Sequence, residues 1–439
     1  MRKISLFNER LQNMFQQRLL LLVLLLALVA RLGLIALLNP QGFYFSDARH
    51  YDQAATSILA GEGWGDQYNR APFYPLVMAA VYAVFGHSFT AVRVIEACAA
   101  LLLCLIIFQI ARRIVAPKTA LAAAALAAIY PHFLLVSVIL YPTHLFTVLL
   151  MGSIYGLILY SENMKWIFLF MSSLCAALAA LTIPAFFFIL PFLLLWVLFE
   201  PQGWRRKVGG FVLYVLVFTA VLTPWTVHNY QKYGRLTLSQ PVPHTVFPDL
   251  NNLEGQKQQI ENGFTDTTEY FKQHPSGTEQ DRLDRIISQY LHHPLQSIKY
   301  MVSELGHFWA LYPDRLDTQS STYQKSIQKE DQRMMTTSST LWRTAKIISI
   351  LFMAPIFLFA LMGFIASFPL NSKSVLLLGS IVCFSFGYSL IYAEVRYRIP
   401  IEPFVLIFTA HGIFFSFEKL KMNFQLKSIA RQSHRGKKC

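Results

Sequence analysis

Acidic residues and arginines stand in a few short polar stretches of an otherwise apolar chain, where they could act together on a phosphate-bearing substrate. These candidates are Asp47, Asp52, Glu62, Asp66, Arg70, Arg396 and Arg398. A guanidinium group presents its N–H donors in a fork that matches two phosphate oxygens, so the arginines indicate phosphate binding. Arg396 and Arg398 could equally be plain surface anchors. An acid in a first helical turn, like Asp47, commonly caps its helix, so its chemistry depends on what surrounds it.

The composition predicts an all-α polytopic membrane protein and excludes a soluble enzyme. The 439 residues are 54% hydrophobic and 14% charged, and this charged share is about half that of soluble domains. Many apolar runs are long enough to cross a bilayer. The net charge of +14 lies mostly in short flanks of these runs. Basic residues in such flanks set membrane topology, so nucleic acid is not expected as a partner.

The charge pattern predicts ten transmembrane helices with both termini in the cytoplasm. Apolar runs lie at about 19–38, 72–85, 89–110, 119–140, 144–160, 165–182, 184–199, 208–224, 345–369, 374–392 and 400–417. The second run is too short for an ordinary span. If 72–85 does not cross, every basic loop falls on the cytoplasmic side. We therefore expect 72–85 to be an interfacial or re-entrant helix of a multi-pass inner (plasma) membrane protein.

This topology divides the chain into four expected regions. They are an N-terminal membrane domain at 1–225 with a first outer loop at 39–88, an extracytoplasmic segment at 226–342, C-terminal membrane helices at 343–417, and a basic cytoplasmic tail at 418–439. The first outer loop should carry an amphipathic helix that begins near Ser46 and ends at Gly61. The outer segment should be helical near 279–291 and from Pro294 to about residue 310, while 240–278 reads as loop.

Metal-dependent and nucleotide-dependent chemistry are not indicated. His132 and His144 flank an outer turn with no cysteine or nearby carboxylate in sequence, so a metal site is not expected there. No glycine-rich phosphate-binding motif is present. Arg31 falls inside the first apolar run and must face protein or water, either as a packed cation or as another phosphate contact. We expect no cofactor.

Several polar motifs recur in an order that resembles one membrane enzyme family. The matching stretches are Ser46-Asp47, Arg70-Ala71-Pro72-Phe73-Tyr74-Pro75, Pro224-Trp225 and the segment from Arg396 to Pro403. In this order and spacing they resemble the polyprenyl-phosphate-sugar glycosyltransferases of the type C fold. That family includes the protein O-mannosyltransferases, the lipid A aminoarabinose transferase and the family 39-like bacterial proteins.

The resemblance implies an inverting transfer on the outer face of the inner membrane. A sugar would move from a polyprenyl-phosphate donor to a hydroxyl of a glycan, lipid or protein acceptor. Asp47 would be the general base. The lipid phosphate and sugar would be bound by Arg396 and Arg398, next by Arg70, and by Tyr397, Tyr51 and Asp52.

Two other functions remain open at this point. A lipid or sugar transporter or flippase would also have about ten spans, but it should show inverted repeats and charges near the middle of the membrane. The charges here cluster at the outer rim. A non-catalytic member of the same fold is the second alternative, because Ala48 follows Asp47 where many relatives carry a second acid.

Overall fold

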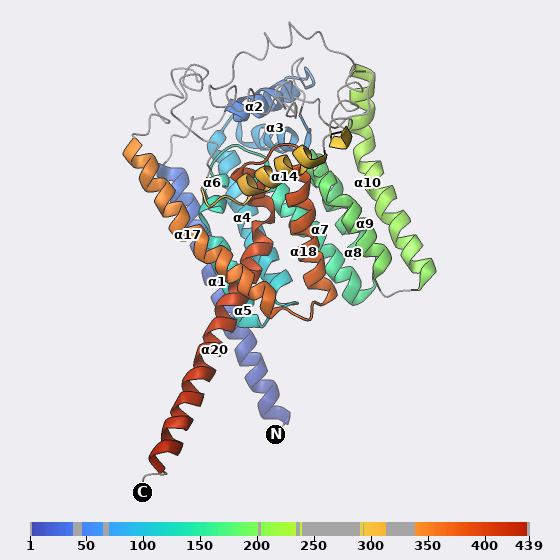
Figure 1. Ribbon diagram of the computed structural model, residues 1–439. Helices are drawn as coiled ribbons and strands as arrows, with labels where there is room; N and C mark the ends of the chain where they lie inside the picture. Colours follow the sequence, from blue (N-terminus) through green and yellow to red (C-terminus); the bar gives the residue numbers. More distant parts are fainter. Residues whose placement is uncertain are drawn as a thin grey trace.

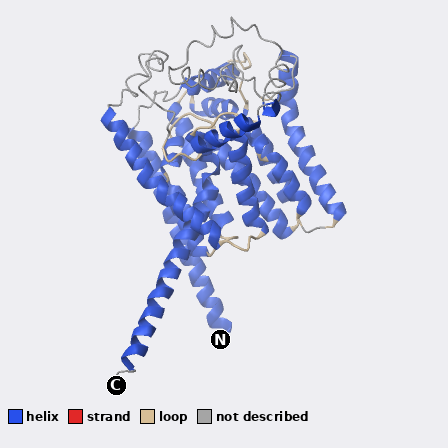
Figure 2. Cartoon of the chain, viewed as in Figure 1, coloured by secondary structure: helices blue, strands red, loops and turns tan. Residues whose placement is uncertain are grey.

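The computed structural model describes residues 2–37, 46–64, 70–200, 203–233, 238, 290–292, 294–312 and 339–436. Every regular element within these ranges is a helix (Figure 2). Seven of them are long and apolar enough to cross a membrane. The predicted all-α, multi-pass membrane architecture is therefore confirmed. The predicted helix at 279–291 and the loop at 240–278 lie outside the described residues, apart from Tyr290 and Leu291, which are helical.

The helices form one bundle with a layer across one end. The long helices are α1 (Arg2–Leu37), α4 (Phe89–Ala111), α7 (Thr143–Asn163), α10 (Trp204–Tyr233), α17 (Ser339–Ala366), α18 (Ser372–Ser389) and α20 (Glu402–Gly436). Shorter helices stand among them, namely α5 (Pro117–Ile129), α8 (Trp166–Ala180) and α9 (Leu190–Phe199). These three occupy the places of the remaining predicted spans (Figure 1).

Prolines account for the shortness of two of the predicted spans. The run at 119–140 divides into α5 and the short helix α6 (Pro131–Val136), because a proline inside a helix removes a hydrogen bond and clashes with the preceding turn. The run at 184–199 likewise divides into the 3₁₀ helix η1 (Pro184–Phe188) and α9. The predicted span at 400–417 instead continues without a break, so the predicted basic tail at 418–439 is helical as far as Gly436.

The small helices lie at the end of the bundle opposite both termini. Helices α2 (Ser46–Leu59) and α3 (Phe73–Phe85) lie across that end, with α14 (Pro294–Phe308) nearby on one side of the bundle (Figure 1). The short helix α19 (Val395–Arg398) and the 3₁₀ turn η2 (Ile399–Ile401) lead directly into α20. The polar motifs of the sequence other than Pro224-Trp225, which belongs to α10, are thus carried by the elements of this layer.

Basic residues gather at the other end of the bundle. The Arg113 Nε and Lys373 Nζ atoms lie 2.9 and 2.5 Å from the two carboxylate oxygens of Glu162. Arg206 donates to the backbone oxygen of Met164. These contacts join the ends of α4, α7, α10 and α18, so the loops that the sequence assigned to one side of the membrane do meet on one side.

Two glycines allow α17 and α20 to cross at close range. A Cβ atom on Gly363 of α17 would lie 1.9 Å from the carbonyl oxygen of Phe408, and one on Gly412 of α20 would lie 1.9 Å from that of Phe359. The two backbones can approach only because neither glycine has a side chain, as is common where membrane helices pack. This crossing fixes the C-terminal helix α20, which follows directly after the arginine-bearing helix α19 and the turn η2.

Candidate functional site

Helix α2 forms because one of its faces is apolar and can pack into the layer. Ala48, Tyr51, Ala54 and Ala55 are buried, at the helical spacing that the sequence predicted. The helix stops at Leu59, and the following Gly61 adopts a φ of +77°. Only glycine takes this left-handed conformation without steric cost, so the predicted end of the helix is confirmed.

Helix α3 is anchored at its first residue by the membrane domain. The backbone N–H of Phe73 donates to the carbonyl oxygen of Leu181 at 2.9 Å, which satisfies an otherwise unpaired donor at the helix start. The helix ends at Gly86, where φ is +72°. With 13 residues, α3 is too short to span the bilayer. Its position across the end of the bundle agrees with the predicted non-crossing helix (Figure 1).

Asp52 joins α2 to the far end of α3. Its Oδ1 atom accepts a hydrogen bond from the Tyr82 hydroxyl at 2.8 Å and lies 2.8 Å from Nε2 of His87. The Asp52 side chain is 13% exposed. The carboxylate is therefore engaged in packing the two helices together, and its expected contact with substrate remains a prediction.

The loop after α2 is fixed to the end of α10 by two tryptophans. The Trp64 ring meets the Trp225 ring edge to face, with centroids 4.7 Å apart. The indole N–H of Trp225 donates to the carbonyl oxygen of Leu238 at 2.7 Å. The tryptophan of the Pro-Trp motif therefore has a structural role. Its apolar ring packs against Trp64, and its N–H group has the hydrogen-bond acceptor that a buried indole needs.

Tyr51 is the centre of a cluster that unites distant parts of the sequence. The guanidinium carbon of Arg70 lies 5.5 Å from the Tyr51 ring centroid, within cation–π range. The Tyr141 ring meets Tyr51 edge to face at 6.2 Å, and the Tyr74 ring does so at 5.3 Å. Tyr141 is in turn within electrostatic range of the Arg396 guanidinium. Two predicted phosphate-binding arginines, Arg70 and Arg396, therefore flank one aromatic cluster.

Arg396 is the accessible arginine of the C-terminal motif. Its side chain is 43% exposed, and its Nε atom lies 2.7 Å from Oε2 of Glu394. It also donates to the Tyr397 hydroxyl at 3.2 Å. The Tyr397 ring stacks on that of Tyr388, with centroids 4.7 Å apart and planes 6° from parallel. Tyr397 is thus held by α18 and supports Arg396.

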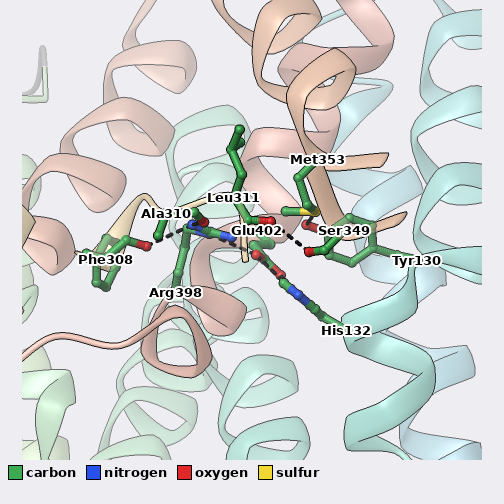
Figure 3. A network of polar contacts seen from close by, with 9 residues as sticks. All are labelled: Tyr130, His132, Phe308, Ala310, Leu311, Ser349, Met353, Arg398 and Glu402. Carbon is green, nitrogen blue, oxygen red and sulfur yellow. Dashed lines mark hydrogen bonds and ion pairs between the residues drawn. The ribbon is translucent and has the colours of Figure 1, made fainter. Parts of the chain in front are cut away.

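Arg398 is placed quite differently, inside a buried polar network (Figure 3). Both Arg398 and Glu402 have 0% exposed side chains, and Nε of Arg398 lies 2.9 Å from Oε1 of Glu402. Arg398 also donates to the carbonyl oxygens of Phe308 at 2.8 Å and Ala310 at 3.0 Å. His132 Nδ1 lies 2.9 Å from the other Glu402 oxygen. A phosphate contact by Arg398 would require exchange of these partners, so that role remains a prediction.

Asp47 is the second residue of α2, one turn before Tyr51. Residues four apart on a helix share a face, so the backbone places Asp47 on the Tyr51 side of α2. Its side chain lies outside the part of the chain that is described. Its role as a base remains a prediction.

Some residues of these two clusters are not among the predicted site residues. Tyr141 meets the Tyr51 ring, and Glu394 pairs with Arg396. The spacing of Arg398 and Glu402, four residues apart on a helix, could have indicated an ion pair. Nothing in the sequence linked His132 to Glu402, because 270 residues separate them.

Arg31 faces protein, as required for a charge within a span. It is fully buried, and its Nη1 atom donates to the carbonyl oxygens of Ala27 and Ala128, both at 3.0 Å. Ala128 belongs to the last turn of α5, where a cation interacts favourably with the helix dipole. Among the described residues, no group of three or more His, Cys, Asp or Glu side chains could hold a metal ion.

Comparison with known proteins identifies the architecture. Residues 69–228 match the family model described as dolichyl-phosphate-mannose-protein mannosyltransferase. A search of curated proteins finds no match. Residues 69–228 include the Arg70–Pro75 motif, α3 and the Pro-Trp motif of α10.

Solved structures of two kinds match nearly the whole chain. The Archaeoglobus fulgidus oligosaccharyltransferase tethered with an acceptor peptide gives a TM-score of 0.57 at 15% identity, covering 93% of this chain and 50% of that one. ArnT from Cupriavidus metallidurans bound to undecaprenyl phosphate gives 0.54 at 13% identity, covering 95% and 64%. The chain thus spans about half the length of the oligosaccharyltransferase.

At these identities the structural likeness shows the fold. The family model adds a sequence match that includes Arg70, Tyr74 and Tyr141 of the Tyr51 cluster. The chain therefore shares the type C fold of these glycosyltransferases, and its residues 69–228 match the family model described as dolichyl-phosphate-mannose-protein mannosyltransferase.

Proposed function

We propose that the protein is a membrane glycosyltransferase that moves a sugar, with inversion, from a polyprenyl-phosphate donor to an acceptor hydroxyl. The observation that carries this proposal is the Tyr51 cluster, in which Arg70 and Arg396 flank one group of aromatic rings one helical turn from Asp47. Two accessible cations beside an acid fit a donor whose leaving group is a phosphate. The fold shared with ArnT bound to undecaprenyl phosphate supports the same donor class.

In the proposed reaction, an oxygen of the acceptor attacks the anomeric carbon of the donor sugar. Asp47 takes the hydroxyl proton as the new C–O bond forms, and the bond from the anomeric carbon to the phosphate oxygen breaks. The electron pair leaves with the polyprenyl phosphate. Arg396 and Arg70 stabilise the negative charge that develops on this group. Attack from the face opposite the leaving phosphate accounts for the inversion.

The supporting residues of the site have distinct roles in this proposal. Tyr51 and Tyr397 hold the two arginines by ring contacts. Asp52 fixes α2 against α3, and Arg398 fixes the segment that carries Arg396. We therefore assign Asp52 and Arg398 as positioning residues, and we assign direct contact with the donor to Arg70 and Arg396.

We further propose that the site faces the outer side of the inner membrane, with both termini cytoplasmic. The basic residues Arg113, Arg206 and Lys373 share one end of the bundle, and the Tyr51 cluster lies in the layer at the other end. Basic loops remain on the cytoplasmic side of bacterial membranes. In this orientation the first loop at 39–88 and the segment 226–342 are extracytoplasmic, and 226–342 is available to recognise a glycan, lipid or protein acceptor.

A reconstituted assay tests the proposed activity. The purified protein is placed in liposomes with a polyprenyl-phosphate sugar and a mixture of envelope glycans, lipids or peptides as acceptors. We expect free polyprenyl phosphate to form in step with a glycosylated acceptor that has the opposite anomeric configuration. A nucleotide sugar supplied alone should give no product.

The same liposomes separate the proposal from its rivals. Movement of the lipid-linked sugar between leaflets without cleavage of its phosphate bond would indicate a flippase. Saturable donor binding with no release of polyprenyl phosphate from any acceptor mixture would indicate a non-catalytic protein of the same fold.

A further inference from the structure

Helix α14 presents three different faces around its axis. Ser297, Glu304 and Phe308 are buried against the bundle. Gln296, Lys299 and Ser303 form a polar exposed face. Leu291, just before the helix, and Leu295, Ile298, Val302 and Leu305 form a third face, which we call the apolar stripe. A helix with polar and apolar surfaces side by side is typical of a membrane interface.

The apolar stripe is unusually exposed for a continuous row of aliphatic side chains. The exposed fractions are 73% for Leu291, 75% for Leu295, 56% for Ile298, 64% for Val302 and 39% for Leu305. The residues follow one another at intervals of three or four, so they share one side of the helix. Phe308 packs against the bundle, whereas the side chains of the stripe are exposed.

The inner face of α14 is hydrogen-bonded to the segment that precedes Arg396. The Tyr290 hydroxyl donates to the carbonyl oxygen of Leu390 at 2.6 Å, and the Tyr300 hydroxyl donates to that of Ile391. Oε2 of Glu304 accepts from the backbone N–H of Ala393 at 2.7 Å. Burial, and then the charge of Glu304, raises the pKa of Tyr290, so its hydroxyl remains a donor at neutral pH.

The end of α14 is tied to the segment that follows Arg396. Arg398 donates to the carbonyl oxygens of Phe308 and Ala310, which lie at the end of the helix where backbone acceptors lack helical partners (Figure 3). Arg398 is itself paired with Glu402 in the first turn of α20. Helix α14 is therefore fastened to the chain on both sides of Arg396.

We propose that the apolar stripe of α14 lies in the outer leaflet of the bilayer and that this lipid contact positions Arg396. The outer placement rests on the proposed function. Lipid acyl chains hold α14 against the rim of the bundle, and α14 holds residues 390–398 through the contacts above. The guanidinium of Arg396 is thereby kept at the depth where the phosphate of a membrane-bound donor lies. In this scheme the bilayer is a structural part of the donor site.

The surroundings of the stripe favour lipid as its occupant. Helix α14 packs on α18, a candidate span whose Val382 and Phe386 side chains are 63% and 53% exposed. Figure 1 shows α14 crossing the upper end of α18 on the outside of the bundle. The stripe thus belongs to a helix that packs on a candidate span with exposed apolar side chains. The adjoining polar face carries Lys299, whose charge suits phospholipid head groups.

A photo-crosslinking experiment identifies the occupant directly. A benzophenone amino acid is placed at Val302 in the stripe or at Ser303 on the polar face, in the full chain in liposomes. Illumination should give a phospholipid adduct from position 302 and a much weaker one from position 303. A cross-linked dimer from position 302, or equal lipid labelling at both positions, would overturn the proposal. This measurement needs no transfer activity, so it stands apart from any failure of the proposed function.

A charge introduced into the apolar stripe tests whether α14 positions Arg396. Ile298→Asp places a carboxylate on the stripe, and Ser303→Asp is the matched control on the polar face. We expect Ile298→Asp to raise the KM for the lipid donor on the order of tenfold or more, since small misplacement of a binding group is costly. Ser303→Asp should change it less than twofold. Unfolding temperatures should be equal, because both positions are exposed.

A double variant links the effect to Arg396. If α14 acts through this arginine, Ile298→Asp should add little to the donor KM of Arg396→Ala, because the group that it positions is already gone. Fully multiplicative effects of the two substitutions would contradict the proposed path. An unchanged KM in Ile298→Asp alone would show that lipid contact does not position the site.

Discussion

The Arg70 guanidinium lies over the ring of Tyr51, 5.5 Å from its centroid, and so links the end of the first outer loop to the helix that begins with Ser46 and Asp47. A guanidinium held over a ring keeps its N–H edges available for an anion in the plane. The contact therefore orients the Arg70 guanidinium relative to α2.

Replacement of this arginine by lysine should weaken donor binding even though the charge is kept. Lysine cannot offer the planar fork that matches phosphate oxygens. We expect Arg70→Lys to raise the KM for a polyprenyl-phosphate sugar about tenfold. Tyr51→Leu should raise it about fivefold, since a cation–π contact contributes ~1 kcal/mol. Tyr51→Phe keeps the ring and should stay near wild type. Equal kinetics for Arg70→Lys and wild type would remove Arg70 from the donor site.

Because Asp52 holds α2 against α3, its replacement should act mainly on stability. Tyr82→Phe deletes one of its hydrogen bonds and should cost ~1 kcal/mol of unfolding free energy. Asp52→Ala leaves a buried tyrosine hydroxyl without its acceptor, which costs ~1–3 kcal/mol. Thermal unfolding in detergent should show the larger drop for Asp52→Ala. A donor KM that rises in Asp52→Ala but not in Tyr82→Phe would instead indicate that Asp52 contacts substrate.

The buried Arg398–Glu402 pair should show strong non-additivity. Removing one partner leaves an uncompensated buried charge, so Arg398→Met or Glu402→Leu alone should cost ~3–5 kcal/mol. The double variant should unfold at a higher temperature than Glu402→Leu, because no unpaired guanidinium remains. If the two losses simply add, the pair contributes no coupling and the network of Figure 3 does not hold the segment as described.

The crossing of α17 and α20 predicts an effect of a single methyl group. Gly363→Ala places a Cβ within 1.9 Å of a backbone oxygen, so the helices must separate and the unfolding temperature should fall by several degrees. Gly33→Ala in α1 is the control, since no atom lies within 4 Å of the new Cβ. That variant should be neutral or slightly stabilised, because alanine favours helix more than glycine does. Similar behaviour of the two variants would mean that the crossing is looser than observed.

The sequence was most informative where local rules and the bilayer act together. Hydrophobic length, basic flanks and the shortness of 72–85 predicted the membrane class and the non-crossing helix α3. Gly61 ended α2 where the left-handed conformation is needed. Each of these features depends on residues close together in the sequence or on the boundary between bilayer and water. Such features can therefore be predicted from short stretches of sequence.

The different roles of Arg396 and Arg398 could not be predicted in this way. Arg396 and Arg398 are equivalent in sequence, yet one is half exposed and the other is fully buried. They differ because Arg398 donates to the carbonyl oxygens of Phe308 and Ala310. These two residues lie at the end of α14, about 90 residues earlier in the chain. Tyr141 could not be predicted as a site residue either, because its neighbours Tyr51 and Arg396 come from opposite ends of the chain.

The central claim is that Asp47 removes the proton of the acceptor, and an isosteric pair of variants tests it most directly. Asp47→Asn and Asp52→Asn each delete one carboxylate of α2, and transfer is measured in liposomes supplied with a polyprenyl-phosphate sugar. We predict that Asp47→Asn lowers kcat on the order of a hundredfold or more, with an unchanged unfolding temperature. Asp52→Asn should keep most of the turnover. Full transfer by Asp47→Asn would contradict the account.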